Sequence, residues 1–218
     1  MPALKDFNQR FKYLCLSIVI NSAGNALAIS TNLGSAVWTG SGLNLAHWTG
    51  ISLGTILFLY GIVITIMNQL LLGHFDRRRF ISNIMYTIPF SYLVEWFEYL
   101  WNYLGVNQLG FGWRIILDIV GLFMVAAAVS IYARCNLIMH PNDDLAYIIR
   151  FKFGNGSAII SQWISYIPPL IIILLSYFFT GHLYAIGFGT VWALITQGAV
   201  MRWSDYHVFP NLKHHIDL

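Results

Sequence analysis

Residues 32–39 read NLGSAVWT, and residues 136–143, which lie 104 positions further along the chain, read NLIMHPND. The same offset pairs Gly50 with Gly154 and sets Gly24 opposite an alanine. Few identities survive, so a duplication is a hypothesis at this point. If it is real, the chain consists of two halves, which we place at roughly 13–104 and 113–203.

The composition indicates that the chain is surrounded by lipid rather than by water. Of its 218 residues, 57% are hydrophobic and only 10% are charged. Soluble domains carry about 25% charged residues, so this chain has too few to cover a water-exposed surface. The net charge of +3 is small and gives no reason to expect a nucleic-acid partner.

Six apolar runs are long enough to cross a bilayer, since about 20 helical residues span the roughly 30 Å hydrocarbon layer. We place these runs at 13–33, 51–73, 80–104, 113–138, 158–180 and 183–203. The sequence therefore predicts an all-α polytopic membrane protein, with residues 1–218 forming one integral domain of six transmembrane helices. Because each half would hold three spans, a duplication would make the halves inverted repeats.

The basic residues predict the orientation, because cytoplasmic segments carry an excess of Lys and Arg. With the N-terminus inside, the outer side keeps only Arg114. We therefore expect both termini to be cytoplasmic. The basic residues of the inner side are Lys5, Arg10, Lys12, Arg77, Arg78, Arg79, Arg134, Arg150, Lys152, Arg202 and Lys213.

Four charged side chains fall in the outer parts of the third and fourth spans. Glu95 and Glu98 are three residues apart, and Arg114 and Asp118 are four apart, so each pair shares a helix face. Charges at such depth cost a few kcal/mol unless they are paired or face water. We expect them, together with Trp101, to line an outward-facing cavity that binds a positively charged group. A purely structural alternative, in which Glu98 pairs with Arg114 and Asp118 caps the pair, stays open.

The outer connection 34–50 contains glycines and aromatic residues but no Asp, Glu, Lys or Arg. Irregular backbone at membrane depth is tolerated only where it is buried or lines a cavity. We expect this segment to cover the acidic pocket, where Trp38, His47 and Trp48 would bind a flat, nitrogen-bearing ring by stacking and cation–π contacts. An amphipathic helix at the membrane interface is an equal alternative.

Small residues on the first span, Ser22, Gly24, Ala26 and Ala28, allow another helix to approach closely. That helix would belong either to the same chain or to a partner subunit.

The inner connection 139–157 predicts a short amphipathic helix after Pro141. Asp143 and Asp144 would fall in its first turn, where acids interact favourably with the helix dipole. The competing interpretation is a cytoplasmic gate or docking surface.

The sequence carries no signature of an enzyme. It contains no P-loop, no Gly-rich nucleotide fingerprint, no HExxH and no nucleophile elbow. Cys15 and Cys135 lie in apolar segments without metal-ligand spacing. We expect no catalysis, no cofactor and no metal site.

Two segments resemble a known family. Residues 23–55 resemble the first-half signature of the YczE/YyaS-like bacterial membrane family. They contain a span of small residues, a turn between a Gly and a Trp, and a Gly-containing segment that leads back into the membrane. Residues 140–160 resemble its second-half segment, and the likeness extends to about residue 200. This chain departs from the family by having Ser35-Ala36-Val37 where a Pro before the Trp is usual. The resemblance implies a fold and a bacterial plasma membrane, but no activity.

In design, the chain is also similar to the substrate-binding S-component of an energy-coupling factor (ECF) vitamin importer. Such subunits work with a transmembrane coupling subunit and two ATPase subunits. The resemblance implies that the small residues of the first span face the coupling subunit. It also implies that the outer connection and the two glutamates hold an amine-bearing heterocycle, such as a hydroxymethylpyrimidine- or pyridoxine-like compound.

The leading hypothesis from the sequence is therefore a substrate-binding membrane subunit of a multi-subunit vitamin or vitamin-precursor importer. A self-sufficient, ion-coupled small-solute transporter is the first alternative. A non-transporting membrane scaffold or sensor is the second.

Overall fold

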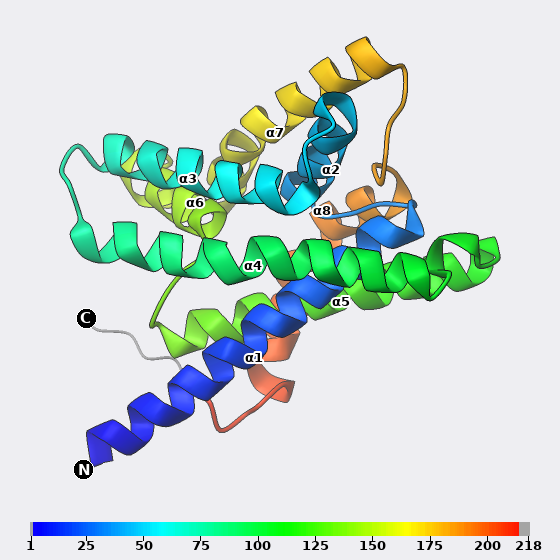
Figure 1. Ribbon diagram of the computed structural model, residues 1–218. Coiled ribbons are helices and arrows are strands. Elements are labelled where there is room, and N and C mark those ends of the chain that lie inside the picture. Colours follow the sequence, from blue (N-terminus) through cyan, green and yellow to red (C-terminus); the bar gives the residue numbers. More distant parts are fainter. Residues whose placement is uncertain (1, 214–218) are drawn as a thin grey trace.

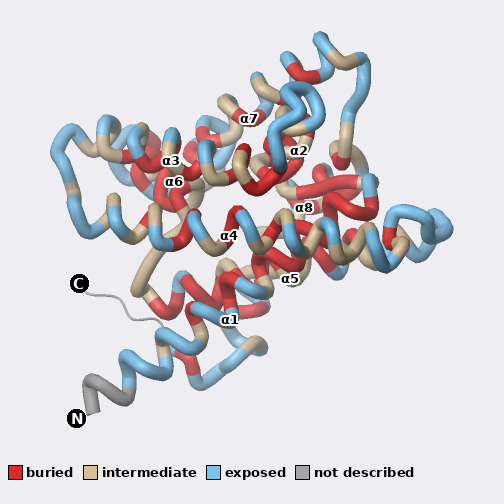
Figure 2. Tube along the Cα trace, viewed as in Figure 1, coloured by how far each residue is buried: buried red, intermediate tan, exposed pale blue. Residues whose placement is uncertain are grey.

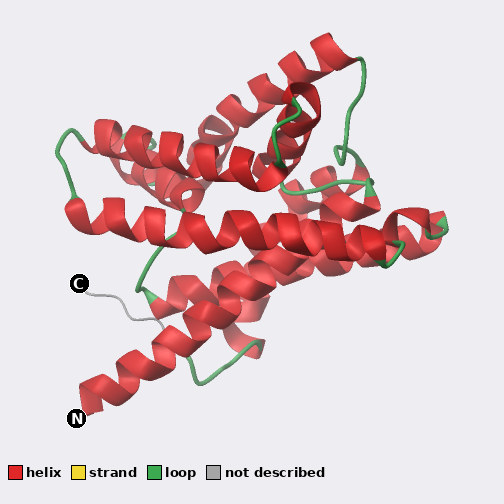
Figure 3. Ribbon diagram, in the orientation of Figure 1, coloured by secondary structure: helices red, strands yellow, loops and turns green. Residues whose placement is uncertain are grey.

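The computed structural model describes residues 2–213, except the side chains of residues 2–5 and 158–159. The described chain is helical throughout and contains no strand, which confirms the all-α prediction (Figures 1 and 3). Four helices are long and apolar enough to cross a membrane: α1 from Asp6, α3, α5, and α7 from Ile160. The helices are α1 (Pro2–Thr31), α2 (Val37–Thr49), α3 (Leu53–Leu72), α4 (Arg77–Tyr103), the short 3₁₀ helix η1 (Val106–Gln108), α5 (Phe111–Cys135), α6 (Pro141–Lys152), α7 (Ala158–Thr180) and α8 (Phe188–His207).

The two long connections of the sequence each contain a short helix. α2 occupies most of 34–50, and six of its thirteen residues are buried, so this segment is a partly buried helix and not an irregular lid. α6 begins at Pro141, as predicted, and its first turn contains Asp143 and Asp144.

The helix boundaries follow the offset of 104 residues. α1 ends at Thr31 and α5 at Cys135, and α2 begins at Val37 and α6 at Pro141. After each long helix the chain turns at an asparagine in the left-handed region, with φ of 52° at Asn32 and 47° at Asn136. Asn is among the few residues other than Gly that adopt this conformation readily. Each half therefore contains a long helix, a left-handed Asn, a short helix and two further long helices.

The contacts between helices repeat in the same way. α1 packs against α4 and α5, and α5 packs in turn against α8. The short helix of each half packs against the third helix of the other half, α2 against α7 and α6 against α3. Figure 2 shows the buried residues concentrated where these helices meet.

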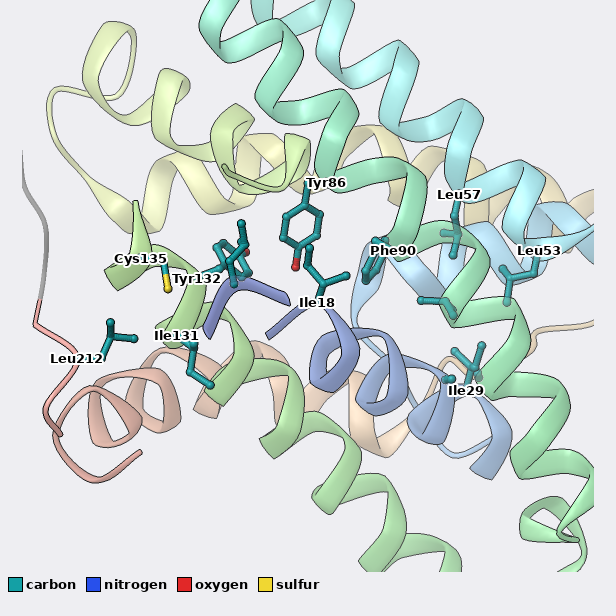
Figure 4. Close-up of a cluster of buried hydrophobic side chains, with 14 residues drawn as sticks. Ile18, Ile29, Leu53, Leu57, Tyr86, Phe90, Ile131, Tyr132, Cys135 and Leu212 are labelled. Atoms are coloured by element: carbon teal, nitrogen blue, oxygen red, sulfur yellow. The ribbon is translucent and has the colours of Figure 1, made fainter. Parts of the chain in front are cut away.

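The hydrophobic core joins the two halves. Tyr86 and Phe90 of α4 lie in one buried cluster with Ile18 and Ile29 of α1 and with Tyr132 of α5 (Figure 4). The aromatic ring of Tyr86 meets that of Tyr132 edge-on, with centroids 5.2 Å apart. The core thus fixes α1, α4 and α5 around the middle of the molecule.

Basic side chains from other helices contact carbonyl groups at or just beyond the C-terminal ends of three helices. A positive group at a helix C-terminus satisfies unpaired carbonyls and interacts favourably with the negative end of the helix dipole. Three residues predicted to be cytoplasmic, Arg10, Lys152 and Arg134, serve in this way. Arg10 donates to Cys135 O at the end of α5 (2.8 Å), Lys152 to Leu71 O and Leu72 O of α3 (both 2.8 Å), and Arg134 to Val208 O (2.7 Å), Phe209 O (3.0 Å) and Leu212 O (3.0 Å) after α8.

Candidate functional site

An internal cavity of about 380 Å³ lies where the two halves meet, and residues of all eight α-helices line it. The first turns of both short helices contribute to it, with Trp38 and Thr39 from α2 and Asn142 and Asp143 from α6. At the offset of 104, Trp38 corresponds to Asn142 and Thr39 to Asp143. Equivalent turns of the two halves therefore both line the cavity.

A buried series of hydrogen-bonded side chains forms one side of the cavity. Thr39 Oγ1 donates to Asn25 Oδ1 (2.7 Å), and Asn25 Nδ2 donates to Asn21 Oδ1 (2.9 Å). Asn21 Nδ2 in turn donates to the hydroxyl of Tyr86 (2.7 Å). This series of hydrogen bonds fixes the first turn of α2 relative to α1 and α4. It explains why α1 carries polar residues in an otherwise apolar segment.

Ionisable groups lie beside the end of this series, where Tyr86 packs on Tyr132 and His140. The hydroxyl of Tyr132 donates to Asp143 Oδ2, and His140 Nδ1 accepts from the backbone N–H of Asn142 (3.2 Å). Asp143 belongs to α6 and His140 to the loop before it, and neither lies in a helix that is long and apolar enough to cross a membrane. Burial raises the pKa of Asp143 to about 6, although the hydrogen bond from Tyr132 opposes this. Burial lowers the pKa of His140 to about 3, so this imidazole is neutral near pH 7.

The two halves differ in how their last two helices pack. α3 and α4 pack closely, and a Cβ atom at Gly61 would lie 2.2 Å from Thr87 Cγ2. α7 and α8, their counterparts, make at most slight contact. Gly198 of α8 lines the cavity and is exposed, and nothing lies within 4 Å of the position its Cβ would take. The cavity is therefore closed between α3 and α4 and open beside α8.

The predicted acidic pair does not line this cavity. Glu95 is half-buried against α3, where a Cβ at Gly54 would lie 2.5 Å from Glu95 Oε2. Glu98 accepts a hydrogen bond from the side chain of Asn102, one turn further along α4. Within residues 2–213, no ion pair joins Arg114 to Glu95, Glu98 or Asp118. None of these four charges lines the cavity, and the pair between Glu98 and Arg114 that the structural alternative expects is not formed within the described residues.

Asp118 is buried away from the cavity. Its side chain is fully inaccessible, and neither carboxylate oxygen has a hydrogen-bond partner of normal geometry. The carboxylate lies against the first turn of α8, where a Cβ at Gly189 would be 2.0 Å from Asp118 Oδ2. Asp118 thus contacts the first turn of α8.

The predicted aromatic residues separate into two groups. Trp38 lines the cavity. Trp48 stacks on Phe179 with centroids 4.8 Å apart, and His47 stacks on Tyr184 at 3.8 Å, so both hold the C-terminal end of α2 against α7 and the segment that follows it. Trp101 donates from its indole N–H to Ala23 O of α1 (3.2 Å).

The small residues of α1 are used inside the chain. Ser22, Ala26 and Ala28 are fully buried. At Gly24 a Cβ atom would lie 2.6 Å from Gly121 O, and at Gly121 one would lie 2.7 Å from Gly24 O. α1 and α5 cross closely because both positions lack a side chain. The expected partner-subunit face made of these four residues is therefore not at the surface.

Comparison with known proteins places the chain in a family but does not add an activity. A family of unknown function, DUF6198, matches residues 8–206. No curated protein and no solved structure matches the chain.

Proposed function

The chain belongs to the DUF6198 family, whose description assigns no activity, and we propose from its geometry that it is a self-sufficient membrane carrier for a small polar solute. The observation that carries this proposal is the position of the cavity. It lies between two halves of matching helix order, and the first turns of both short helices line it. Secondary transporters built from inverted repeats bind their substrates at the repeat interface, beside helices that stop inside the membrane.

In this proposal the six longer helices α1, α3, α4, α5, α7 and α8 span a bacterial plasma membrane, and both termini are cytoplasmic. Three spans in each half make the halves inverted, so α2 and α6 enter from opposite sides. The distribution of basic residues supports this orientation, since Arg10, Arg134 and Lys152 each contact a helix end that would then face the cytoplasm.

The unequal packing of the two halves supports alternating access. The contact between α3 and α4 closes one side of the cavity, whereas the separation of α7 and α8 opens the other. In an inverted repeat, each half can adopt the conformation of the other, which would open α3 from α4 and close α7 on α8. A solute that binds while the cavity is open beside α8 would leave after α3 and α4 separate and α7 and α8 close.

A substrate-binding subunit of a multi-subunit importer is the competing proposal. It needs a binding site near the outer connection and a free face for a coupling subunit. The burial of Ser22, Gly24, Ala26 and Ala28 gives it less support than the carrier.

Reconstitution of the purified chain alone into liposomes tests the carrier. Solutes that raise its melting temperature in detergent would be offered to the liposomes in radiolabelled form. We expect uptake or exchange without any ATPase. Binding without movement, with uptake restored only when ATPase partners are added, would favour the importer subunit. Binding without movement under either condition would favour a sensor.

A further inference from the structure

We propose that the solute held in the cavity is a small organic cation and that the carboxylate of Asp143 recognises its charge. This inference rests on the proposed function, because it names the substrate class of the same cavity.

The charge of the cavity wall carries the inference. Among the described residues that line the cavity, Asp143 is the only acidic one, and none is Lys or Arg. The other polar lining groups are amides, hydroxyls, indoles and the neutral imidazole of His140. A carboxylate in such surroundings attracts a positive guest, because few water molecules and no opposing charge screen it.

The neighbouring acid shows that the role of Asp143 is not merely to start α6. Asp144 Oδ1 pairs with Arg79 Nη1 at 2.8 Å, and Asp144 Oδ2 accepts from Asn83 Nδ2 at 3.1 Å, outside the cavity lining. His140 supplies the N-cap of α6. Asp143 has no cationic partner within residues 2–213 and accepts only a neutral hydroxyl there, that of Tyr132. The chain thus provides a cation for one of two adjacent acids and leaves the other for a guest.

The groups around Asp143 agree with this assignment. The titratable side chains that interact with it come from α4 (Tyr86), α5 (Tyr132), α6 itself (Asp144) and α7 (Tyr166), and His140 lines the same cavity. None of them is positively charged near pH 7. Trp38 and Trp163 add indole rings to the lining, and indole faces are the strongest cation–π partners among side chains. The counterpart of Asp143 in the first half is Thr39, so the acid is specific to one half.

The rates at which a single cysteine reacts with charged reagents test the electrostatic potential inside the cavity. Gly198→Cys places a thiol on the cavity wall in open space, in a background where Cys15 and Cys135 are alanine. We expect trimethylammonium-ethyl methanethiosulfonate to react about tenfold faster than the sulfonate-ethyl reagent, after correction for their rates with a free thiol. Asp143→Asn should remove this preference, and Glu95→Gln, an acid outside the cavity, should keep it.

Equal rates for the two reagents, or a preference that persists in Asp143→Asn, would overturn the assignment of Asp143. If neither reagent reaches the thiol, the open cavity of the proposed function fails as well.

Protection of the same cysteine separates the charge from the cavity. Benzylamine, benzyl alcohol and benzoate share one ring and differ in charge, and each would compete with the uncharged reagent methyl methanethiosulfonate. We expect benzylamine alone to slow labelling, and Asp143→Asn to abolish its effect. Equal protection by benzyl alcohol would refute cation recognition and leave the carrier standing. An absence of protection by benzylamine would also refute it.

Discussion

Gly61 of α3 lies directly against Thr87 of α4: a Cβ atom at position 61 would be 2.2 Å from Thr87 Cγ2 and 2.9 Å from Thr87 Cβ. Both residues line the cavity. This contact closes the cavity between α3 and α4, and the absence of a side chain at Gly61 makes it possible. If α3 and α4 separate during transport, this is where they must part.

The first prediction is a disulfide between these two positions. In the background without Cys15 and Cys135, Gly61→Cys with Thr87→Cys should cross-link under mild oxidation, because bonded cysteines have Cβ atoms about 3.8 Å apart and a small movement reaches that distance. Loss of labelling by a maleimide reports the bond. We expect the oxidised protein to bind solute but not to transport it, and reduction to restore transport. Gly198→Cys with Thr87→Cys should not cross-link, since no atom lies within 4 Å of the Cβ position at Gly198. Full transport by the cross-linked protein would contradict alternating access.

The second prediction concerns the crossing of α1 and α5. Gly24→Ala should lower the melting temperature, with a loss of about 1–3 kcal/mol of stability, because its Cβ would meet the backbone of Gly121 at 2.6 Å. Gly112→Ala is the matched control on α5, since nothing lies within 4 Å of its Cβ position. We expect the control to change stability by no more than about 0.5 kcal/mol. An unchanged melting temperature for Gly24→Ala would contradict the close packing of α1 on α5 and would favour a partner subunit at this face of α1.

Much of this fold could be predicted from the sequence, because apolar runs of bilayer length determine where long helices form. The six predicted runs overlap α1, α3, α4, α5, α7 and α8 to within a few residues at most boundaries. The largest error is at the start of α1, where polar residues continue the helix beyond the apolar run. α1 begins at Pro2 rather than at 13, because helical propensity and not hydropathy sets its start.

The site was harder to predict. From the sequence, Asp143 and Asp144 are two equivalent acids in the first turn of α6, and only the partners of Asp144, Arg79 and Asn83, distinguish them. The sequence predicts a binding role for Glu95 and Glu98 because they are charged in an apolar run, yet they lie outside the cavity, where Glu95 packs against α3 and Glu98 accepts from Asn102. The correspondence of Asn32 with Asn136 in the sequence indicates the site best, because it aligns the first turns of the two short helices.

The third prediction compares two basic side chains. Arg134 is buried, donates to four carbonyl groups at and beyond the end of α8, and lies 3.7 Å from Asp205 Oδ1, so Arg134→Met should cost at least about 2 kcal/mol by removing the shared donor of these groups. Lys152 is exposed and caps α3, so Lys152→Met should cost less than about 1 kcal/mol. Thermal unfolding in detergent measures both. Equal losses would mean that burial does not govern these contacts. Arg134→Lys should recover only part of the loss, since an ammonium group cannot reproduce the fork of a guanidinium group.

The fourth prediction tests whether the side chain of Asp118 points toward α8. Gly189→Ala should destabilise the protein, because its Cβ would lie 2.0 Å from Asp118 Oδ2. Asp118→Ala should remove that obstacle, so the double variant should be more stable than the sum of the single effects predicts. We expect a coupling energy of about 1–3 kcal/mol in a double-mutant cycle. Simple additivity would show that the carboxylate does not lie against α8.

The last prediction is a pH dependence of cation binding. The pKa of Asp143 is raised from its ordinary value to about 6, so the carboxylate is charged above pH 6 and increasingly neutral below it. Benzylamine stays protonated between pH 5 and 8, as a lysine side chain does, so only the protein changes charge. Its affinity should be constant at pH 7–8 and fall by about tenfold per pH unit below 6. The neutral His140, whose pKa is lowered to about 3, contributes nothing in this range. Titration calorimetry at each pH measures the affinity, with Asp143→Asn as the control that should bind weakly and without pH dependence. Affinity that rises as the pH falls would exclude Asp143 as the recognising group.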